Sequence, residues 1–231
     1  MFLIYVAILG ASIVLLVLTP LYSYLSKRPS HKILTLTIKG LNTGTSLLFA
    51  IIGYIRLVNQ EITSVPKNLI HNNWILIGLS IFFVADIVLR IHIATGGILF
   101  FFGHVAYMIF FLSLSSFNAI SILIFTIACV VVLCYFYRYS PILDGLKVPV
   151  ALYGMTICGS LSIGILLPFT FGIYGYLPAI AIILLVCSDI MLARNKMVEE
   201  TALTRTLVLL YYFTGQFLMA MTLYLPSIYE K

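Results

Sequence analysis

The sequence predicts an all-α membrane protein, built as a bundle of about eight transmembrane helices. Hydrophobic residues make up 62% of the 231 positions and charged residues only 9%, which leaves too little polar surface to cover a water-soluble globule of this length. The apolar residues also gather into runs long enough to cross a hydrocarbon core about 30 Å thick, at about 1.5 Å per residue. We therefore expect residues 1–231 to form a single polytopic domain.

Eight apolar runs meet this length requirement, and polar or helix-breaking residues separate them. Tight turns are expected at 94–97 and at 115–118, and Pro168 is expected to close the sixth helix. The first run has no basic residues before it and no convincing cleavage site after it, so we expect it to remain as a helix. The predicted helices cover about 2–25, 33–57, 74–90, 98–114, 119–138, 149–167, 171–192 and 202–225, with position 176 as an alternative start for the seventh.

Basic residues in the connections predict the orientation of the bundle. Nine of them follow odd-numbered helices and three lie on the opposite side. Because cytoplasmic loops carry an excess of Lys and Arg, both termini are expected to face away from the cytoplasm, across what we expect to be a bacterial inner membrane. The nine are Lys27, Arg28, Lys32, Arg90, Arg138, Lys147, Arg194, Lys196 and Arg205, and the three are Arg56, Lys67 and Lys231.

Two aspartates stand in apolar segments that share a pattern. Asp86 lies in FFVADIVLR (82–90) and Asp189 in VCSDIMLAR (186–194), so that a small residue, Asp, Ile, a spacer and Leu recur in order. An ionisable side chain at membrane depth costs at least about 2.5 kcal/mol, so it should face a protein interior or a water-filled cavity. The two segments indicate a functional site and suggest an internal repeat of 1–115 and 117–231, with the halves related as parallel repeats.

Polar residues on other helices are expected at a similar depth. Counting about 1.5 Å per residue from the basic ends places Lys39, His104 and Tyr153 with the two aspartates, roughly 6 to 10 Å below the cytoplasmic boundary. Tyr212 and Gln216, one turn apart on the last helix, are expected deeper, as a floor. The sequence thus predicts one polar layer to which several helices contribute.

Simpler interpretations of these residues stay open. Each aspartate could pair at the membrane boundary with the arginine that follows it, Arg90 or Arg194. Lys39 could extend its ammonium to the cytoplasmic surface. His104 could be a core histidine bonded to another helix, and the tyrosines could serve packing alone.

The order of these residues resembles the YhhN family of lysoplasmalogenases over nearly the whole chain. The motifs that carry the likeness are Lys39, Asp86, Gly96-x3-Phe100-x3-His104-x2-Tyr107, Ser188-Asp189-x2-Leu192-Ala193 and Tyr212-x3-Gln216, on the second, third, fourth, seventh and eighth helices. Each motif alone is weak, and their order at the expected helices makes the likeness specific. The chain departs from the family at Gly40, where the family usually has Pro, and at Ala85, where it usually has Gly.

This resemblance implies a hydrolase that cleaves the vinyl ether bond of a lysoplasmalogen, giving a fatty aldehyde and glycerophosphocholine or glycerophosphoethanolamine. Protonation of the alkenyl carbon creates an oxocarbenium ion that water captures, so the reaction needs an acid and a group that stabilises the cation and activates water. Two carboxyl groups in an apolar cavity suit this need because they resist ionising together. The expected catalytic residues are Asp86 and Asp189, without a cofactor or metal. The supporting or substrate-binding residues are Lys39, His104, Tyr107, Tyr153, Tyr212 and Gln216.

The expected partner is a lysophospholipid substrate drawn from the membrane. The formal net charge of +6 does not indicate nucleic acid, because the basic residues lie in short connections between apolar runs. Three alternatives stay open: a small transporter that uses the same charges as a proton or ion relay, a hydrolase of another lysolipid bond, and a metal held by Asp86, His104 and Asp189. The sequence leaves the oligomeric state open.

Overall fold

The computed structural model describes residues 17, 19–22, 24–25, 32–59, 73–89, 91–138, 147–198 and 200–224. Every regular element in these residues is helical, which confirms the predicted fold class. The elements are α2 (Lys32–Asn59), α4 (Trp74–Val88), α5 (Ile93–Leu114), α6 (Ala119–Tyr137), α7 (Lys147–Gly164), α8 (Leu167–Phe171), α9 (Ile173–Met197), α10 (Ala202–Met221) and the short 3₁₀ helix η2 (Thr222–Tyr224).

Six candidate spans in the described residues are long and apolar enough to cross a membrane, which makes the chain an integral membrane protein. Five of them correspond to α2, α5, α6, α9 and α10, and the sixth joins α7 to α8. Helix α4 is as apolar but has only 15 residues, or about 22 Å of helix. The helix predicted at 2–25 lies largely outside the described residues. The orientation of the bundle stays a prediction.

Two of the predicted boundaries are wrong, and local hydrogen bonding explains both. Residues 94–97 form the first turn of α5 rather than a turn before it, because His92 caps the helix and accepts from the Thr95 amide. Helix α7 already ends at Gly164, and Pro168 opens α8 instead. Proline is tolerated there because the first amides of a helix need no intrahelical acceptor. The turn at 115–118 is confirmed, with Asn118 capping α6.

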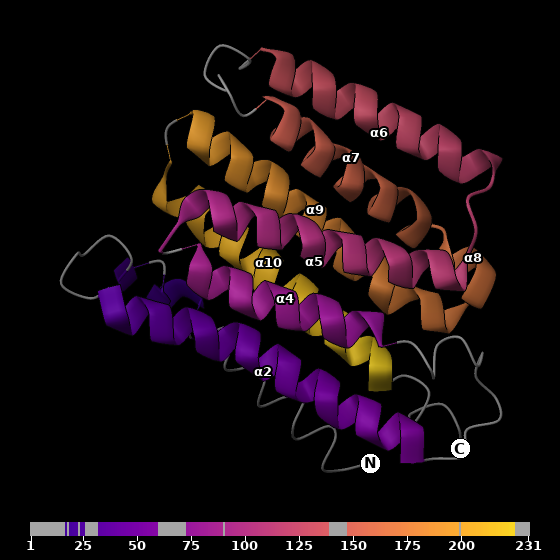
Figure 1. Ribbon diagram of the computed structural model, residues 1–231, viewed down its shortest axis with the longest axis horizontal. Coiled ribbons are helices and arrows are strands. Elements are labelled where there is room, and N and C mark those ends of the chain that lie inside the picture. The colour runs from indigo at the N-terminus through magenta and orange to yellow at the C-terminus, as the bar shows by residue number, and fades with distance from the viewer. Residues whose placement is uncertain are drawn as a thin grey trace.

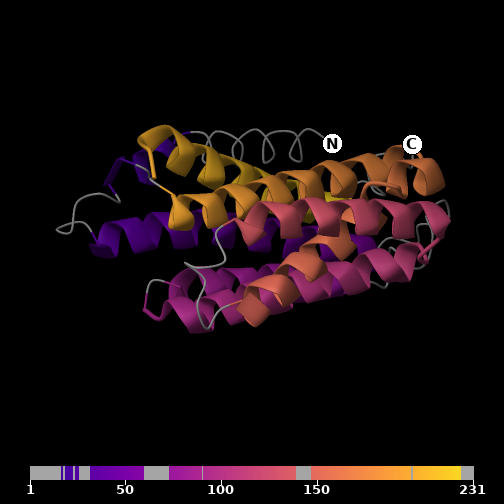
Figure 2. The ribbon, with the colours of Figure 1, turned by 90° about the horizontal axis from the view of Figure 1, so that it is seen from above.

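The helices run roughly side by side (Figure 1). Helix α4 packs along α5, and α9 packs along α10. Helix α2 lies against α4 and α10, while α7 lies against α5 and α9. In the turned view α9 and α10 lie above α4 and α5 (Figure 2), so the interior lies between these two pairs.

Glycines bring both helix pairs into close contact. A Cβ on Gly96 of α5 would lie 2.5 Å from the Leu89 Cα at the end of α4. A Cβ on Gly215 of α10 would lie 2.8 Å from the Leu185 Cγ on α9. Such distances leave room for hydrogen only, so each pair depends on a small residue in the way that membrane helices commonly do.

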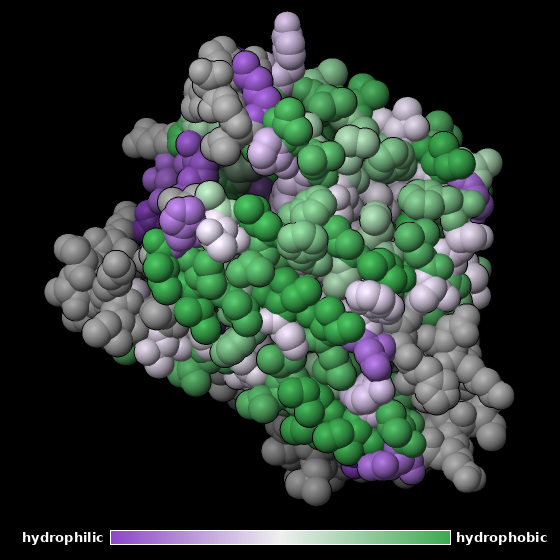
Figure 3. Space-filling view, viewed as in Figure 1, coloured by the Kyte–Doolittle hydropathy of each residue, from purple (hydrophilic) through white to green (hydrophobic). Residues whose placement is uncertain are grey.

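The outer surface suits a hydrocarbon environment. Hydrophobic residues cover the broad middle of the face drawn in Figure 3, and hydrophilic residues gather mainly toward the end where α5 begins. Helix α6 is the least buried span, with only 6% of its most apolar stretch inside the protein, and it packs chiefly against α7. The core and its polar groups therefore lie among α2, α4, α5, α7, α9 and α10.

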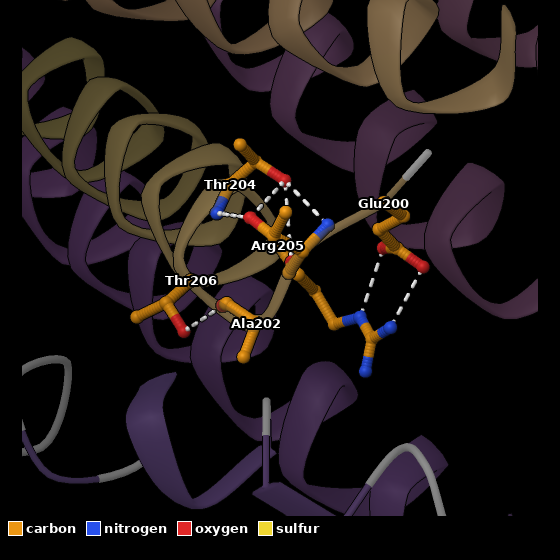
Figure 4. Close-up of polar contacts among 6 residues, drawn as sticks. Glu200, Ala202, Thr204, Arg205 and Thr206 are labelled. Carbon is orange, nitrogen blue, oxygen red and sulfur yellow. Dashed lines mark hydrogen bonds and ion pairs between the residues drawn. The ribbon is translucent and has the colours of Figure 1, made fainter. Parts of the chain in front are cut away.

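The start of α10 is held by polar contacts (Figure 4). Thr201 and Thr204 form a reciprocal capping box, in which each side chain accepts from the other's backbone amide. The Arg205 guanidinium makes two hydrogen bonds to the Glu200 carboxylate, at 2.8 and 2.7 Å. These contacts mark where α10 begins.

Candidate active site

The first half of the site surrounds Asp86, in the last turn of α4. The Lys39 ammonium on α2 lies 2.7 Å from Asp86 Oδ1, and the Tyr212 hydroxyl on α10 donates to Oδ2 over 3.1 Å. Thr43, one turn after Lys39, also donates to Oδ2, at 2.5 Å. We refer to Lys39, Thr43, Asp86 and Tyr212 as the Asp86 half-site.

Both charges of the Asp86 half-site are buried. The Asp86 side chain is 1% exposed and that of Lys39 is 9% exposed. A buried ion pair persists where additional hydrogen bonds replace the lost water, as the hydroxyls of Thr43 and Tyr212 do here. The Phe100 ring centroid lies 5.9 Å from the ammonium and adds a cation–π contact. The alternative in which Lys39 extends to the cytoplasmic surface is therefore wrong.

The second half surrounds Asp189 on α9. His104 Nε2, on α5, lies 2.8 Å from Asp189 Oδ2. Tyr153 on α7 lies near Asp189, and its ring stands edge-on to the imidazole with the centroids 5.5 Å apart. Arg194 is exposed, so the partner of Asp189 is His104 rather than the arginine that follows it. We refer to His104, Tyr153 and Asp189 as the Asp189 half-site.

Tyr212 and Phe82 join the two half-sites. Tyr212, which donates to Asp86, also interacts electrostatically with Asp189. Phe82, one turn before Asp86 on α4, is fully buried and packs against both the His104 ring, at 5.1 Å between centroids, and the Tyr212 ring, at 6.3 Å. The two carboxylates therefore belong to one aromatic-lined interior, and each has its own basic partner.

A further pair lies next to Phe82. The Tyr107 hydroxyl on α5 donates to Gln216 Oε1 on α10 over 2.6 Å, and the Tyr107 ring packs against Phe82 at 5.2 Å between centroids. Gly78 on α4 makes room for this ring, since a Cβ there would lie 2.5 Å from Tyr107 Cε1. This hydrogen bond links α5 to α10. Tyr212, which was expected below the aspartates together with Gln216, instead bonds to Asp86 directly.

Several polar atoms in this region have no hydrogen-bond partner among the described residues. They are His104 Nδ1, Gln216 Nε2 and both amide atoms of Asn42, which lies three residues after Lys39. All three side chains are at most 1% exposed. Leaving such an atom unpaired costs about 1 to 3 kcal/mol, so it is uncommon unless the atom serves binding or chemistry. The interior therefore offers both donors and acceptors to a ligand.

The two half-sites use their helices in the same way. Asp86 lies on α4. Its partners come from α2, which packs beside α4, and from α10, the last long helix in the second half of the chain. Asp189 lies on α9. Its partners come from α7, which packs beside α9, and from α5, the last helix in the first half of the chain. This is the correspondence that an internal repeat of 1–115 and 117–231 would give, and the repeat itself stays a prediction.

Every site residue singled out from the sequence takes part in these contacts, whereas two further residues were missed. Thr43 bonds to Asp86, and its spacing of four residues from Lys39 on the same helix face could have indicated this. Phe82 touches both half-sites, but one phenylalanine in an apolar run carries no such signal. In the described ranges no three His, Cys, Asp or Glu side chains lie close enough together to hold a metal, so the geometry gives the metal alternative no ligand set.

The fold and the site define a class: a polytopic α-helical membrane protein with two aspartates buried among ionisable and aromatic side chains. The YhhN family model matches residues 34–223. The match includes both half-sites, and the chain belongs to the YhhN family. Neither the comparison with curated proteins nor that with solved structures gave a match.

Proposed function

We propose that the protein is a lysoplasmalogenase, which hydrolyses the vinyl ether bond of a lysoplasmalogen to a fatty aldehyde and a glycerophospho-base. Membership of the YhhN family supports a hydrolase of this kind. The observation that carries the proposal is the pairing of Asp86 with Lys39 and of Asp189 with His104 inside an apolar bundle. These pairs provide what vinyl ether cleavage needs: a proton donor, an acceptor for the proton of water, and an anion for the cationic intermediate.

The substrate also suits the position of the site. A lysoplasmalogen has one chain, which must stay in hydrocarbon, and a phosphate head group that must stay near water. We infer that it enters sideways from the leaflet in which the basic helix ends lie, so that its ether bond, just below the head group, reaches the two half-sites. Phe82 and Phe100 pack against each other with ring centroids 5.5 Å apart beside the two half-sites, and we infer that the apolar alkenyl chain runs past these rings.

Purified protein should release fatty aldehyde from a lysoplasmalogen. The same protein should leave intact an ester lysolipid and an alkyl ether lysolipid of equal chain length, because neither forms an oxocarbenium ion on protonation of carbon. Release of fatty acid from the ester would identify a hydrolase of another lysolipid bond. Absence of both products would favour the relay hypothesis. A chelator should leave the rate unchanged, and loss of activity that an added ion restores would instead indicate a metal enzyme.

Exchange of either aspartate for its amide should remove the activity. Asp86→Asn and Asp189→Asn are each expected to lower the rate of aldehyde release to less than about a tenth of wild type, since a positioned acid, base or anion typically contributes ~10²- to 10⁴-fold. Glu200→Gln is the matched control, because it makes the same chemical change at a partly exposed ion pair outside the site. Wild-type rates in either aspartate variant, with the protein correctly folded in detergent, would remove the proposed catalytic pair.

A further inference from the structure

The carboxylates of Asp86 and Asp189 have different surroundings. Asp86 is surrounded by donors: an ammonium at Oδ1 and the hydroxyls of Thr43 and Tyr212 at Oδ2. An ionised carboxylate can accept all three, and the ammonium balances its charge. Asp86 is therefore arranged as a carboxylate held in place.

The Asp189 half-site has a different composition, because its main partner is an imidazole. His104 Nε2 faces Asp189 Oδ2 at 2.8 Å, which leaves Nδ1 as the second ring nitrogen. Nδ1 is buried on a side chain that is 1% exposed, and no described residue bonds to it. A hydrogen bond at one ring nitrogen fixes the tautomer and determines which nitrogen is left to react. The His104 ring is thus oriented through Nε2, and Nδ1 makes no hydrogen bond to a described residue.

Comparing equivalent helices sharpens this difference. Helices α2 and α7 correspond, and they bring Lys39 to Asp86 and Tyr153 to Asp189. Helices α10 and α5 also correspond, and they bring the Tyr212 hydroxyl to Asp86 and the His104 imidazole to Asp189. One half-site thus holds an ammonium, and the other holds an imidazole, the side chain that enzymes most often use to give and take protons. A group that both gives and takes a proton in each turnover is expected in the second.

We propose that His104 is the group that transfers protons in this enzyme, with Nδ1 as the reacting atom. Asp189 is then a positioning residue that orients the ring and stabilises its charged form, as a carboxylate does for the histidine of a catalytic triad. Asp86 is the fixed anion that faces the oxocarbenium ion. This inference rests on the proposed function and assigns the roles that the function leaves open.

The proton balance closes over one turnover. The imidazolium of His104 gives its Nδ1 proton to the alkenyl carbon beta to the ether oxygen, and the C=C π pair forms the new C–H bond. The resulting oxocarbenium ion is captured by water, and the neutral Nδ1 takes the proton that water releases. The hemiacetal then collapses, its hydroxyl proton passing to the departing glycerol oxygen. His104 ends as it began, and one water has been consumed.

Among the described residues, the charged and titratable groups near His104 are those of the two half-sites and Tyr107, which lies one turn further along α5 and packs on the same Phe82 ring. Asp189 faces His104 from α9 and Tyr153 from α7, and Tyr212 on α10 packs on the same Phe82 ring. Asp86 and Lys39 lie beyond Phe82, whose ring packs on the imidazole. The Ser160 hydroxyl on α7 donates to the His104 backbone carbonyl at 3.4 Å and does not titrate.

The test replaces His104 with Gln. The side-chain amide can keep a hydrogen bond to Asp189 but cannot carry a proton, so kcat for aldehyde release should fall ~10²- to 10⁴-fold while KM stays within a few-fold. In the wild type the rate should decline as the pH rises, because the charged imidazole is the donor. His104→Gln should abolish this decline. His92→Gln, at the exposed cap of α5, is the matched control and should behave as wild type.

Asp189→Asn separates a positioning role from a merely structural one. Removing the carboxylate disfavours the charged imidazole, so the decline in the residual rate should move to lower pH. If His104→Gln retains more than about a third of wild-type kcat, or keeps the wild-type pH dependence, the assignment is wrong. If His104→Gln does not fold, His104→Asn supplies the same comparison. If the wild-type protein releases no aldehyde, the proposed function itself is wrong. That outcome is distinct from a failure of the His104 assignment alone.

Discussion

Lys39 shows how strongly a single residue in this protein can depend on another. Its ammonium is the only cation within ion-pair distance of Asp86 among the described residues, and both side chains are buried. Removing one partner of a buried pair typically costs about 3 to 5 kcal/mol, because the other charge is left without compensation. Lys39→Met should therefore lower the free energy of unfolding by this amount, and the double variant Lys39→Met/Asp86→Asn should recover most of it.

Thermal unfolding in detergent would measure both variants. Arg205→Met is the matched control, since the Arg205–Glu200 ion pair is partly exposed and such pairs contribute about 1 kcal/mol or less. If the double variant is no more stable than Lys39→Met, the two charges do not compensate one another. The pairing of Lys39 with Asp86 would then have to be rejected.

The sequence predicted which residues form the site, but it did not predict which of them pair with each other. Asp86, Asp189, Lys39 and His104 stand out because charged or ionisable groups are rare in apolar runs, and counting residues places them at one depth. Their partners could not be predicted, because depth along a helix says nothing about which helices are neighbours. The arginines that follow the aspartates looked equally suitable by spacing, although Asp189 in fact pairs with His104 on another helix.

At the scale of the helices, the contact of α4 with α5 depends on Gly96. A methyl group there would meet backbone at the end of α4, and backbone cannot move aside as a flexible side chain can. Gly96→Ala should therefore destabilise the protein and, because α4 carries Asp86 and α5 carries His104, should lower activity as well. Gly97→Ala is the matched control, because a Cβ at that position meets nothing within 4 Å.

Unfolding temperature and aldehyde release should both be measured for these two variants. Gly97→Ala is expected to be neutral or slightly stabilising, by up to about 1 kcal/mol, because alanine is the better helix former. Equal behaviour of the two variants would mean that the close contact at Gly96 is not required.

The existence of the helices was easier to predict than their ends. Long apolar runs fix α2, α6 and α10 almost unambiguously, because hydrocarbon requires backbone hydrogen bonds to be made within the segment. The start of α5 was misjudged because Gly96 and Gly97 resemble a turn, whereas both lie inside the helix, where the missing side chain of Gly96 allows close contact with α4. Pro168 was misjudged for a related reason: proline ends one helix or begins the next, and only the hydrogen bonds distinguish the two.

At the scale of the whole molecule, each half-site draws on both halves of the chain. Expressed separately, segments 1–116 and 117–231 should each be inactive, because Asp86 would lack Tyr212 and Asp189 would lack His104. Co-expressed, they should reassemble and regain aldehyde release, since the break falls in the turn between α5 and α6. Co-purification of the two segments from detergent would check assembly, and activity in one segment alone would contradict a site shared between halves.

The dependence of Asp86 on α10 also has a consequence for synthesis. Helix α10 is made after every other long helix described, so the ribosome has already released α2, α4, α5 and α9 when Tyr212 appears. Lys39 and Asp86 can meet early, but the hydroxyl that completes their surroundings arrives with α10. A chain that stalls before that point holds acids and bases without a finished site. Under the proposed function, only chains translated through α10 would release aldehyde, and chains that stall earlier would not hydrolyse the surrounding lipids.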